Sequence, residues 1–124
     1  MAKKVLAIGL DPAFVDFAAF PGFSAEQFRT YIDAQLDQLR GAGYDVTSCL
    51  IDLGETAEAA TTNALQSGRF DCVVIGAGLR LPPERLLLFE RIINLVHALA
   101  PHANICFNTK PADTAEAVQR WVKP

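Results

Sequence analysis

Residues 70–78 read FDCVVIGAG, and this stretch decides the fold. Its centre, residues 72–75, places four apolar side chains in succession, and three of them are β-branched. Strands that are buried on both faces have such continuous apolar runs, whereas strands with one face in water alternate apolar and polar residues. Gly76-Ala-Gly78 then ends the run. The stretch therefore predicts the central strand of a parallel sheet that helices cover on both faces.

Strands and helices alternate outward from this stretch in both directions. Apolar runs predict three further strands, at residues 5–8, 46–53 and 105–107. Helical patterns lie between and after them, at about 11–20, 24–41, 56–66, 82–99 and 113–122. This alternation favours right-handed crossovers in a parallel sheet. We therefore expect a single α/β domain over residues 1–124, a three-layer open parallel sheet of four strands in the order 2-1-3-4.

Local signals mark where several helices begin. Asp11-Pro12 is typical of a helix start, with Asp as the N-cap and Pro in the first turn. Ser24–Gln27 and Asp113–Glu116 both fit the capping-box pattern. For the last helix we expect a packing face made of Val118, Trp121 and Val122.

Composition and charge exclude several classes of function. The formal net charge is −3 and the basic residues form no run, so no nucleic-acid footprint is expected. No window approaches the roughly 20 apolar residues that a membrane span needs, and the first apolar run is short for a signal peptide. Cys49, Cys72 and Cys106 lack paired spacing and fall in predicted strands, which favours reduced, buried thiols. These features predict a cytoplasmic protein.

The carboxyl ends of the predicted strands bring together the residues that could bind a ligand. Ligands of open α/β sheets bind at this edge, where the order of the strands reverses. Glycines 76 and 78 let a backbone approach a ligand and could form an anion-binding nest. The predicted ligand-binding residues are Asp11, Gly76, Gly78, Arg80, Asn108 and Lys110. These residues predict that the ligand is an anionic small molecule. Asp52 and Glu55 add carboxylates near Asp11, but carboxylate spacing alone does not predict a metal site. No cofactor is expected.

Phenylalanine recurs at every third position after the first predicted strand, at Phe14, Phe17, Phe20 and Phe23. These side chains could pack on the core, form a pocket wall or lid, or meet a partner. The helix predicted at 82–99 has an apolar stripe wider than one sheet face needs. A homodimer through this third helix or through the Phe-rich segment is therefore a second expectation.

Two segments resemble response-regulator receiver domains. Leu79-Arg-Leu-Pro-Pro83 is similar to the loop after their central strand, and Asn108-Thr-Lys-Pro111 is similar to their Lys-Pro motif, with Lys110 at the position of the family's lysine. Receivers carry a phosphorylated Asp at the end of their third strand, where this chain has Gly76-Ala-Gly78, and an acidic pair where it has Asp11 alone. The resemblance implies a degenerate receiver-like domain that lacks phosphotransfer.

The strand order also resembles that of flavodoxin-like and Rossmann-like proteins. No Ser/Thr-rich phosphate loop follows the first strand, so FMN is not expected. Stretches of the chain are similar to those of small bacterial proteins of no assigned activity. Three functions stay open at this point: a binder of an anionic small molecule, a receiver-like interaction module working as a dimer, and a small acid–base enzyme that uses Asp11 with Lys110.

Overall fold

A parallel sheet lies at the centre of the structure, a computed structural model that describes residues 2–19 and 21–124. Over these residues it has four strands, in the order β2-β1-β3-β4. The strands are β1 (Lys4–Leu10), β2 (Asp45–Ile51), β3 (Cys72–Ile75) and β4 (Asn104–Phe107). The predicted α/β fold and strand order are confirmed.

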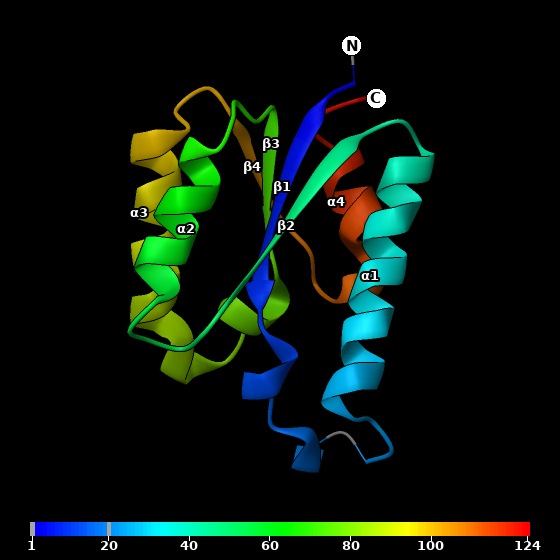
Figure 1. The fold of residues 1–124 in the computed structure, drawn as a ribbon, viewed down its shortest axis with the longest axis vertical. Helices are drawn as coiled ribbons and strands as arrows, with labels where there is room; N and C mark the ends of the chain where they lie inside the picture. Colours follow the sequence, from blue (N-terminus) through cyan, green and yellow to red (C-terminus); the bar gives the residue numbers. More distant parts are fainter. Residues whose placement is uncertain (1, 20) are drawn as a thin grey trace.

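Helices cover both faces of this sheet, as Figure 1 shows. One face carries α1 (Ala25–Gly41) and α4 (Thr114–Gln119), and the other carries α2 (Ala57–Gln66) and α3 (Leu86–Leu99). The loops that follow β1, β3 and β4 all lie at the same end of the molecule (Figure 1). The carboxyl ends of the strands therefore share one rim, while both chain termini lie at the opposite end.

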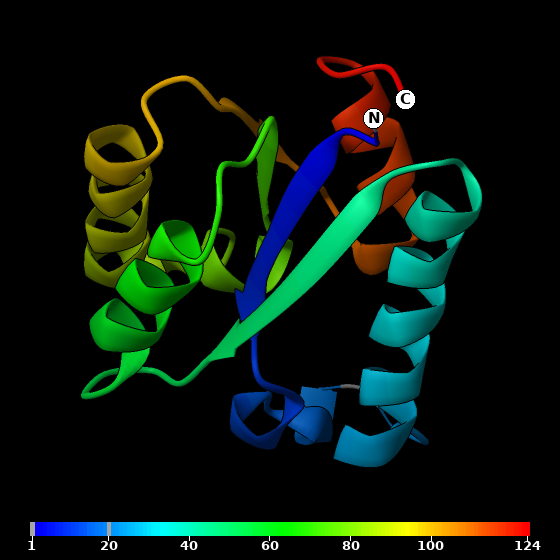
Figure 2. The same ribbon diagram turned by 45° about the horizontal axis from the view of Figure 1, so that its top comes forward.

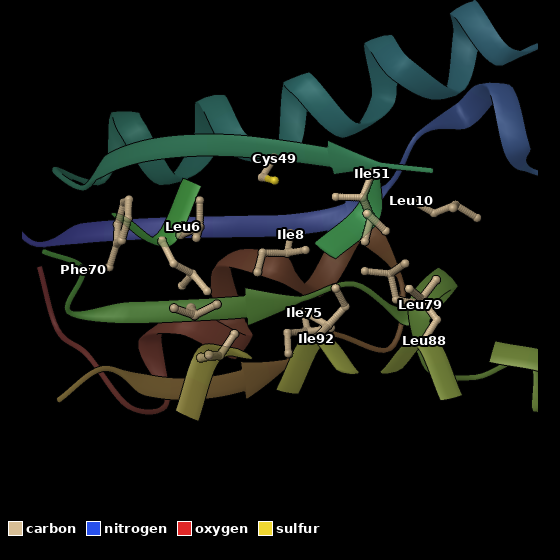
Figure 3. Close-up of a cluster of buried hydrophobic side chains, with 14 residues drawn as sticks. Leu6, Ile8, Leu10, Cys49, Ile51, Phe70, Ile75, Leu79, Leu88 and Ile92 are labelled. Atoms are coloured by element: carbon tan, nitrogen blue, oxygen red, sulfur yellow. The ribbon is translucent and has the colours of Figure 1, made fainter. Parts of the chain in front are cut away.

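Alternation along the strands divides the core into two layers. Ile8, Ile75 and Leu79 belong to the layer under α2 and α3, shown in Figure 3. Val5 and Val74 belong to the layer under α1 and α4. All four residues of β3 are buried, as the continuous apolar run predicts. The three cysteines are buried and unpaired, and the Sγ atoms of Cys72 and Cys106 lie 3.5 Å apart.

The segment after β1 differs from its predicted helix. It forms two 3-10 turns, η1 (Pro12–Phe14) and η2 (Phe17–Ala19), beside the first turns of α1 (Figures 1 and 2). The prediction of one helix was wrong because Val15 is extended and Asp16 caps a new turn, accepting a hydrogen bond from the Ala18 N–H at 3.0 Å. Phe20 lies outside the described residues.

One of the two predicted capping boxes forms. The Ser24 hydroxyl accepts from the Gln27 N–H at 3.1 Å, and the Gln27 side chain accepts from the Ser24 N–H at 2.8 Å. Asp113 makes no side-chain cap of α4, because its carboxylate accepts hydrogen bonds from the residues before it. Trp121 is 60% exposed rather than packed, since α4 ends before it and Val118 and Val122 fill the space under the helix.

Arginine side chains bond to the outer strands of the sheet. Arg40 Nη2 donates to the carbonyl of Val46 at 3.2 Å on β2, and Arg120 Nη2 donates to the carbonyl of Phe107 at 3.0 Å on β4. Asp45 and Asn104 turn their N–H groups toward the neighbouring strands. The carbonyls of Val46 and Phe107, an odd number of residues further along, therefore face outward from the sheet.

The described residues contain no helix with the length and apolar character that crossing a membrane requires.

We expect Ile92→Ala to lower the free energy of unfolding by about 2–5 kcal/mol, because it opens a cavity in the layer under α3, where Ile92 is fully buried. Leu86→Ala is the matched control on the same helix, since Leu86 is 57% exposed, and it should change stability by about 0.5 kcal/mol or less. Urea unfolding monitored by circular dichroism measures both. Equal losses would contradict the observed orientation of α3.

Candidate functional site

A cavity of about 590 Å³ opens at the rim where the strands end. Its walls come from α1, from the carboxyl-terminal halves of β1, β2 and β3, and from the loops that follow β3 and β4. Ligand sites in proteins commonly have volumes of roughly 300–1,000 Å³. The cavity is therefore large enough for a small organic molecule, and it lies at the edge where the sequence predicts one.

The cavity exists because one face of the sheet carries small side chains near this rim. Ala7 and Gly9 on β1, Ser48 on β2 and Gly76 after β3 line it, and all four alternate onto the face under α1. On the opposite face, the same strands carry large side chains that are fully packed, such as Ile8 (Figure 3). The layer between the sheet and α1 thus leaves a space near the rim, whereas the layer under α2 and α3 is filled.

The backbone conformation does not require glycine at the three glycine positions that line the cavity. Gly9, Gly76 and Gly78 line it, whereas positive φ occurs only at Gly22 and Gly43 among the described glycines. A Cβ atom added at any of the three would approach its nearest neighbour at 3.5–3.6 Å, an ordinary contact. The missing side chains therefore leave room in the cavity rather than relieve a clash.

The loops after β3 and β4 are joined through Asn108. Its Oδ1 accepts from the Ala77 N–H at 2.8 Å, and its Nδ2 donates to Thr114 Oγ1 at 2.9 Å. Arg80 Nη2 donates to the Asn108 carbonyl at 2.8 Å. Asn108 is 7% exposed and lines the cavity, so its amide sets the distance between the two loops.

The structure places Arg80 on the other side of this junction from the cavity. It is absent from the cavity lining, and its guanidinium carbon lies 5.3 Å from the ring centroid of Phe107, a residue packed under α3. Arg80, which was predicted to bind the ligand, instead holds the loop after β4 through the Asn108 carbonyl.

The glycine turn after β3 offers few free donors to an anion. The Gly76 N–H donates to the Ile8 carbonyl at 2.9 Å, and the Ala77 N–H is used by Asn108. The nest that the sequence suggests is therefore largely occupied by internal hydrogen bonds.

Lys110 lies exposed at the cavity, on a loop shaped by Asp113. The Asp113 carboxylate accepts from the backbone N–H groups of Thr109 and Lys110, at 2.9 and 3.3 Å, and from the Thr109 hydroxyl. Burial acts to raise the pKa of Asp113, but these hydrogen bonds outweigh it and hold the pKa below its ordinary value. Asp113 therefore stays ionised and fixes the loop that carries Lys110.

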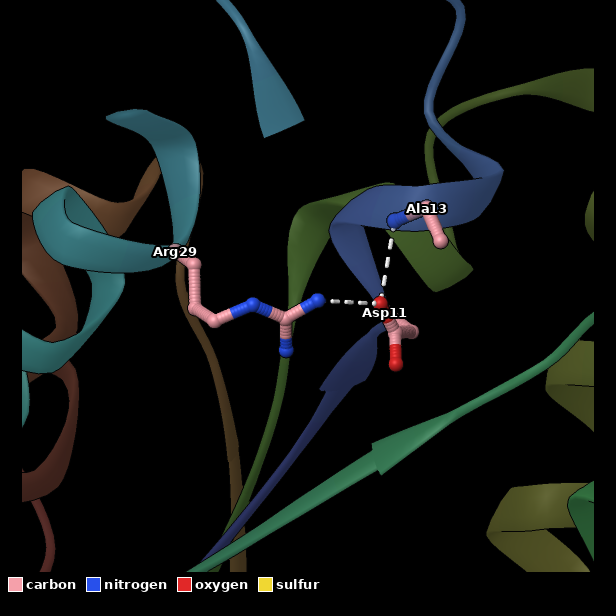
Figure 4. A network of polar contacts seen from close by, with 3 residues as sticks. All are labelled: Asp11, Ala13 and Arg29. Carbon is pink, nitrogen blue, oxygen red and sulfur yellow. Dashed lines mark hydrogen bonds and ion pairs between the residues drawn. The ribbon is translucent and has the colours of Figure 1, made fainter. Parts of the chain in front are cut away.

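Asp11 lies outside the cavity lining and is engaged by other residues (Figure 4). Its Oδ1 accepts from the Ala13 N–H and from Arg29 Nη2, each at 2.9 Å. The Ala13 hydrogen bond, aided by Arg29 and opposed by partial burial, holds the pKa of Asp11 below its ordinary value. The N-cap role predicted for Asp11 is confirmed, and a low pKa makes this carboxylate a weak base.

Phe14 and Phe17 of the Phe-rich segment do not line the cavity. Phe14 is 44% exposed, and Phe17 packs edge-to-face on Phe28 of α1 with ring centroids 5.9 Å apart. Phe28 lines the cavity, as do Val15 and Asp16 of the Phe-rich segment. The segment therefore supports the wall from behind rather than lining it with Phe14 or Phe17.

Three residues that the sequence reasoning missed bring charge to the cavity beside Lys110. Arg85, which follows β3 in the 3-10 turn η4 (Pro83–Arg85), lines it, and its Nε atom is buried without a hydrogen-bond partner among the described residues. Asp16 and Glu84 add carboxylates to the lining. Arg85 belongs to no motif that could have indicated its place. The small residues at 7, 9, 48 and 76, which alternate onto one face of the sheet, could have indicated the cavity itself.

Of the six predicted ligand residues, the structure gathers four at the cavity: Gly76, Gly78, Asn108 and Lys110. In residues 2–19 and 21–124, no three His, Cys, Asp or Glu side chains lie close enough to hold a metal ion. Comparison of the chain with family models, curated proteins and solved structures finds no match. The geometry of this site is therefore the basis for a functional proposal.

We expect Asn108→Ala to lower the free energy of unfolding by about 1–3 kcal/mol, because it leaves the partly buried Ala77 N–H without its acceptor. The Thr114 hydroxyl loses the donor Nδ2 but still donates to the Pro111 carbonyl at 2.7 Å. The control is Asn94→Ala on the exposed surface of α3, where Nδ2 donates to the Glu90 carbonyl, and a change of about 0.5 kcal/mol or less is expected. Urea unfolding gives both values, and amide exchange at Ala77 should accelerate only in the first variant. Unchanged protection of Ala77 would show that Asn108 does not join the loops.

Proposed function

We propose that this protein binds a small organic anion in the cavity at the carboxyl ends of its strands. The proposal is supported by the cavity volume of about 590 Å³, by the glycines that keep it open, and by the two cations in its lining, Arg85 and Lys110. Asn108 and the glycine turn would position the loops around the ligand. Arg80 and Asp11 would act on the shape of the rim rather than on the ligand.

The single observation that carries the proposal is the Arg85 guanidinium in the cavity lining, which lacks a partner among the described residues. Its Nε–H is buried, so a ligand in the cavity would be held by its Nη groups. Arg80 Nε also lacks a partner, but that guanidinium lies over the Phe107 ring and donates to Asn108. The Arg85 guanidinium makes no ion pair or hydrogen bond among the described residues, which leaves it available to an anion.

The test is a thermal-shift screen of organic anions, both carboxylates and phosphorylated metabolites, against the wild-type protein. A ligand at about a hundredfold its Kd should stabilise the fold by about 2.7 kcal/mol, which raises Tm by several degrees. Ile32→Trp should abolish the shift, because Ile32 lines the cavity from α1 and the indole would fill it.

The matched control places the same side chain on the same helix. Gln38 is exposed on α1 outside the cavity lining, so Gln38→Trp should retain the full shift. Shifts that are equal in the two Trp variants, or a wild-type protein that responds to no anion, would overturn the proposal.

A second candidate function is an interaction module that self-associates. The observation that favours it is the exposure of three leucines in the stretch of chain before and at the start of α3: Leu81, Leu86 and Leu87 are 57%, 57% and 67% exposed. Apolar side chains that gather on a surface commonly mark an interface. The receiver-like reading would belong to this function, with Gly76 at the end of β3 in place of a phosphorylated Asp.

For this second candidate we expect a dimer by size-exclusion chromatography with light scattering, and a monomer for the double variant Leu86→Gln, Leu87→Gln. The double variant should keep the wild-type Tm at low concentration, since both side chains are exposed. A wild-type monomer at high micromolar concentration would contradict the module. The acid–base enzyme has no comparable support, because Asp11 is paired with Arg29 and lies outside the cavity.

A further inference from the structure

Apolar side chains form the two main walls of the cavity. Phe28, Ile32 and Leu36 line it from α1, and Leu50 and Val74 line it from the sheet. Gln35 and Ser48 are the polar side chains of these two walls, so a sugar with many hydroxyls would bury several of them without partners, which is unfavourable. The walls therefore select a ligand whose body is apolar.

The charged residues of the lining limit the charge of the ligand. Arg85 and Lys110 are matched in number by Asp16 and Glu84, so the lining as a whole carries no net charge. One oxygen of the Asp16 carboxylate accepts a hydrogen bond from the backbone N–H of Ala18, two residues further along the chain. A phosphate dianion or a polyphosphate would meet these carboxylates, whereas a single negative charge can be held by Arg85.

The backbone at the rim also disfavours phosphate. Phosphate sites use several free N–H groups that converge on one anion. Here the N–H groups of Gly76 and Ala77 donate to Ile8 and Asn108, and those of Thr109 and Lys110 donate to Asp113. A guanidinium, in contrast, matches the planar, bidentate geometry of a carboxylate.

We infer that the ligand is an amphipathic monocarboxylate, whose apolar chain lies between α1 and the sheet and whose carboxylate pairs with Arg85 and Lys110. This inference rests on the proposed function, since it names the class of anion that the same cavity takes. It does not require that the protein change the ligand chemically.

The experiment is isothermal titration calorimetry with hexanoate, heptanoate and octanoate, with 1-octanol as the neutral ligand of the same length, and with AMP as a phosphorylated probe. Each added methylene should tighten binding about fourfold while the cavity has room, because burial of a CH₂ group contributes about 0.8 kcal/mol. Octanol should bind at least about tenfold more weakly than octanoate, since it lacks the charge-assisted pair. AMP should not bind.

Two matched variants place the head and the chain of the ligand. Arg85→Gln should weaken octanoate about tenfold or more and leave octanol unchanged, whereas Arg91→Gln, which removes an arginine paired with Glu58 on the outer surface, should affect neither. Ile32→Trp should abolish binding of octanoate, and Gln38→Trp should retain it.

The outcomes separate this inference from the proposed function. Equal binding of octanoate and octanol, or no dependence on chain length, would overturn the monocarboxylate. If AMP binds in place of octanoate and Ile32→Trp abolishes that binding, the ligand class is wrong and the cavity remains an anion site. If no anion of the screen binds to the wild-type protein, both the class and the site are rejected.

Discussion

The fold depends on the burial of β3 on both of its faces. Because no side chain of this strand reaches water, helices must cover the sheet on both sides, and the backbone of β3 must be paired with β1 and β4 along its length. Parallel neighbours then bring all the strands to an end at one rim. The placement of Ala77 and Asn108 side by side, although they are far apart in the chain, is a direct result of this arrangement.

The two faces of the sheet are filled to different degrees, and this difference produces the site. Large aliphatic side chains complete the layer under α2 and α3, whereas small residues leave room under α1. A residue such as alanine at Gly9 or Gly76 would meet only ordinary contacts. Glycine in a strand weakens it without a packing benefit, and at Gly9 the missing side chain adds to the space under α1.

The sequence predicted the architecture well because the architecture follows from local patterns. The run at 72–75 and the alternation of strands and helices sufficed for the strand order, and the Ser24 box formed as expected. The site was harder, because the destination of a polar side chain depends on its neighbours in space. Asn108 and Lys110 could be placed by the end of a strand, but nothing in the sequence indicated that Asp11 would bind Arg29 or that Arg80 would lie over Phe107. Arg85 was missed because it lies beside a cavity that only the packing of α1 defines.

The guanidinium groups on the outer strands limit how two molecules of this protein can approach each other. An uncovered strand edge presents carbonyls and N–H groups on which another chain can continue the sheet. Arg40 and Arg120 each occupy an outward carbonyl with a bulky, hydrated cation, one on β2 and one on β4. Lateral growth of the sheet into a filament is thus discouraged at both borders.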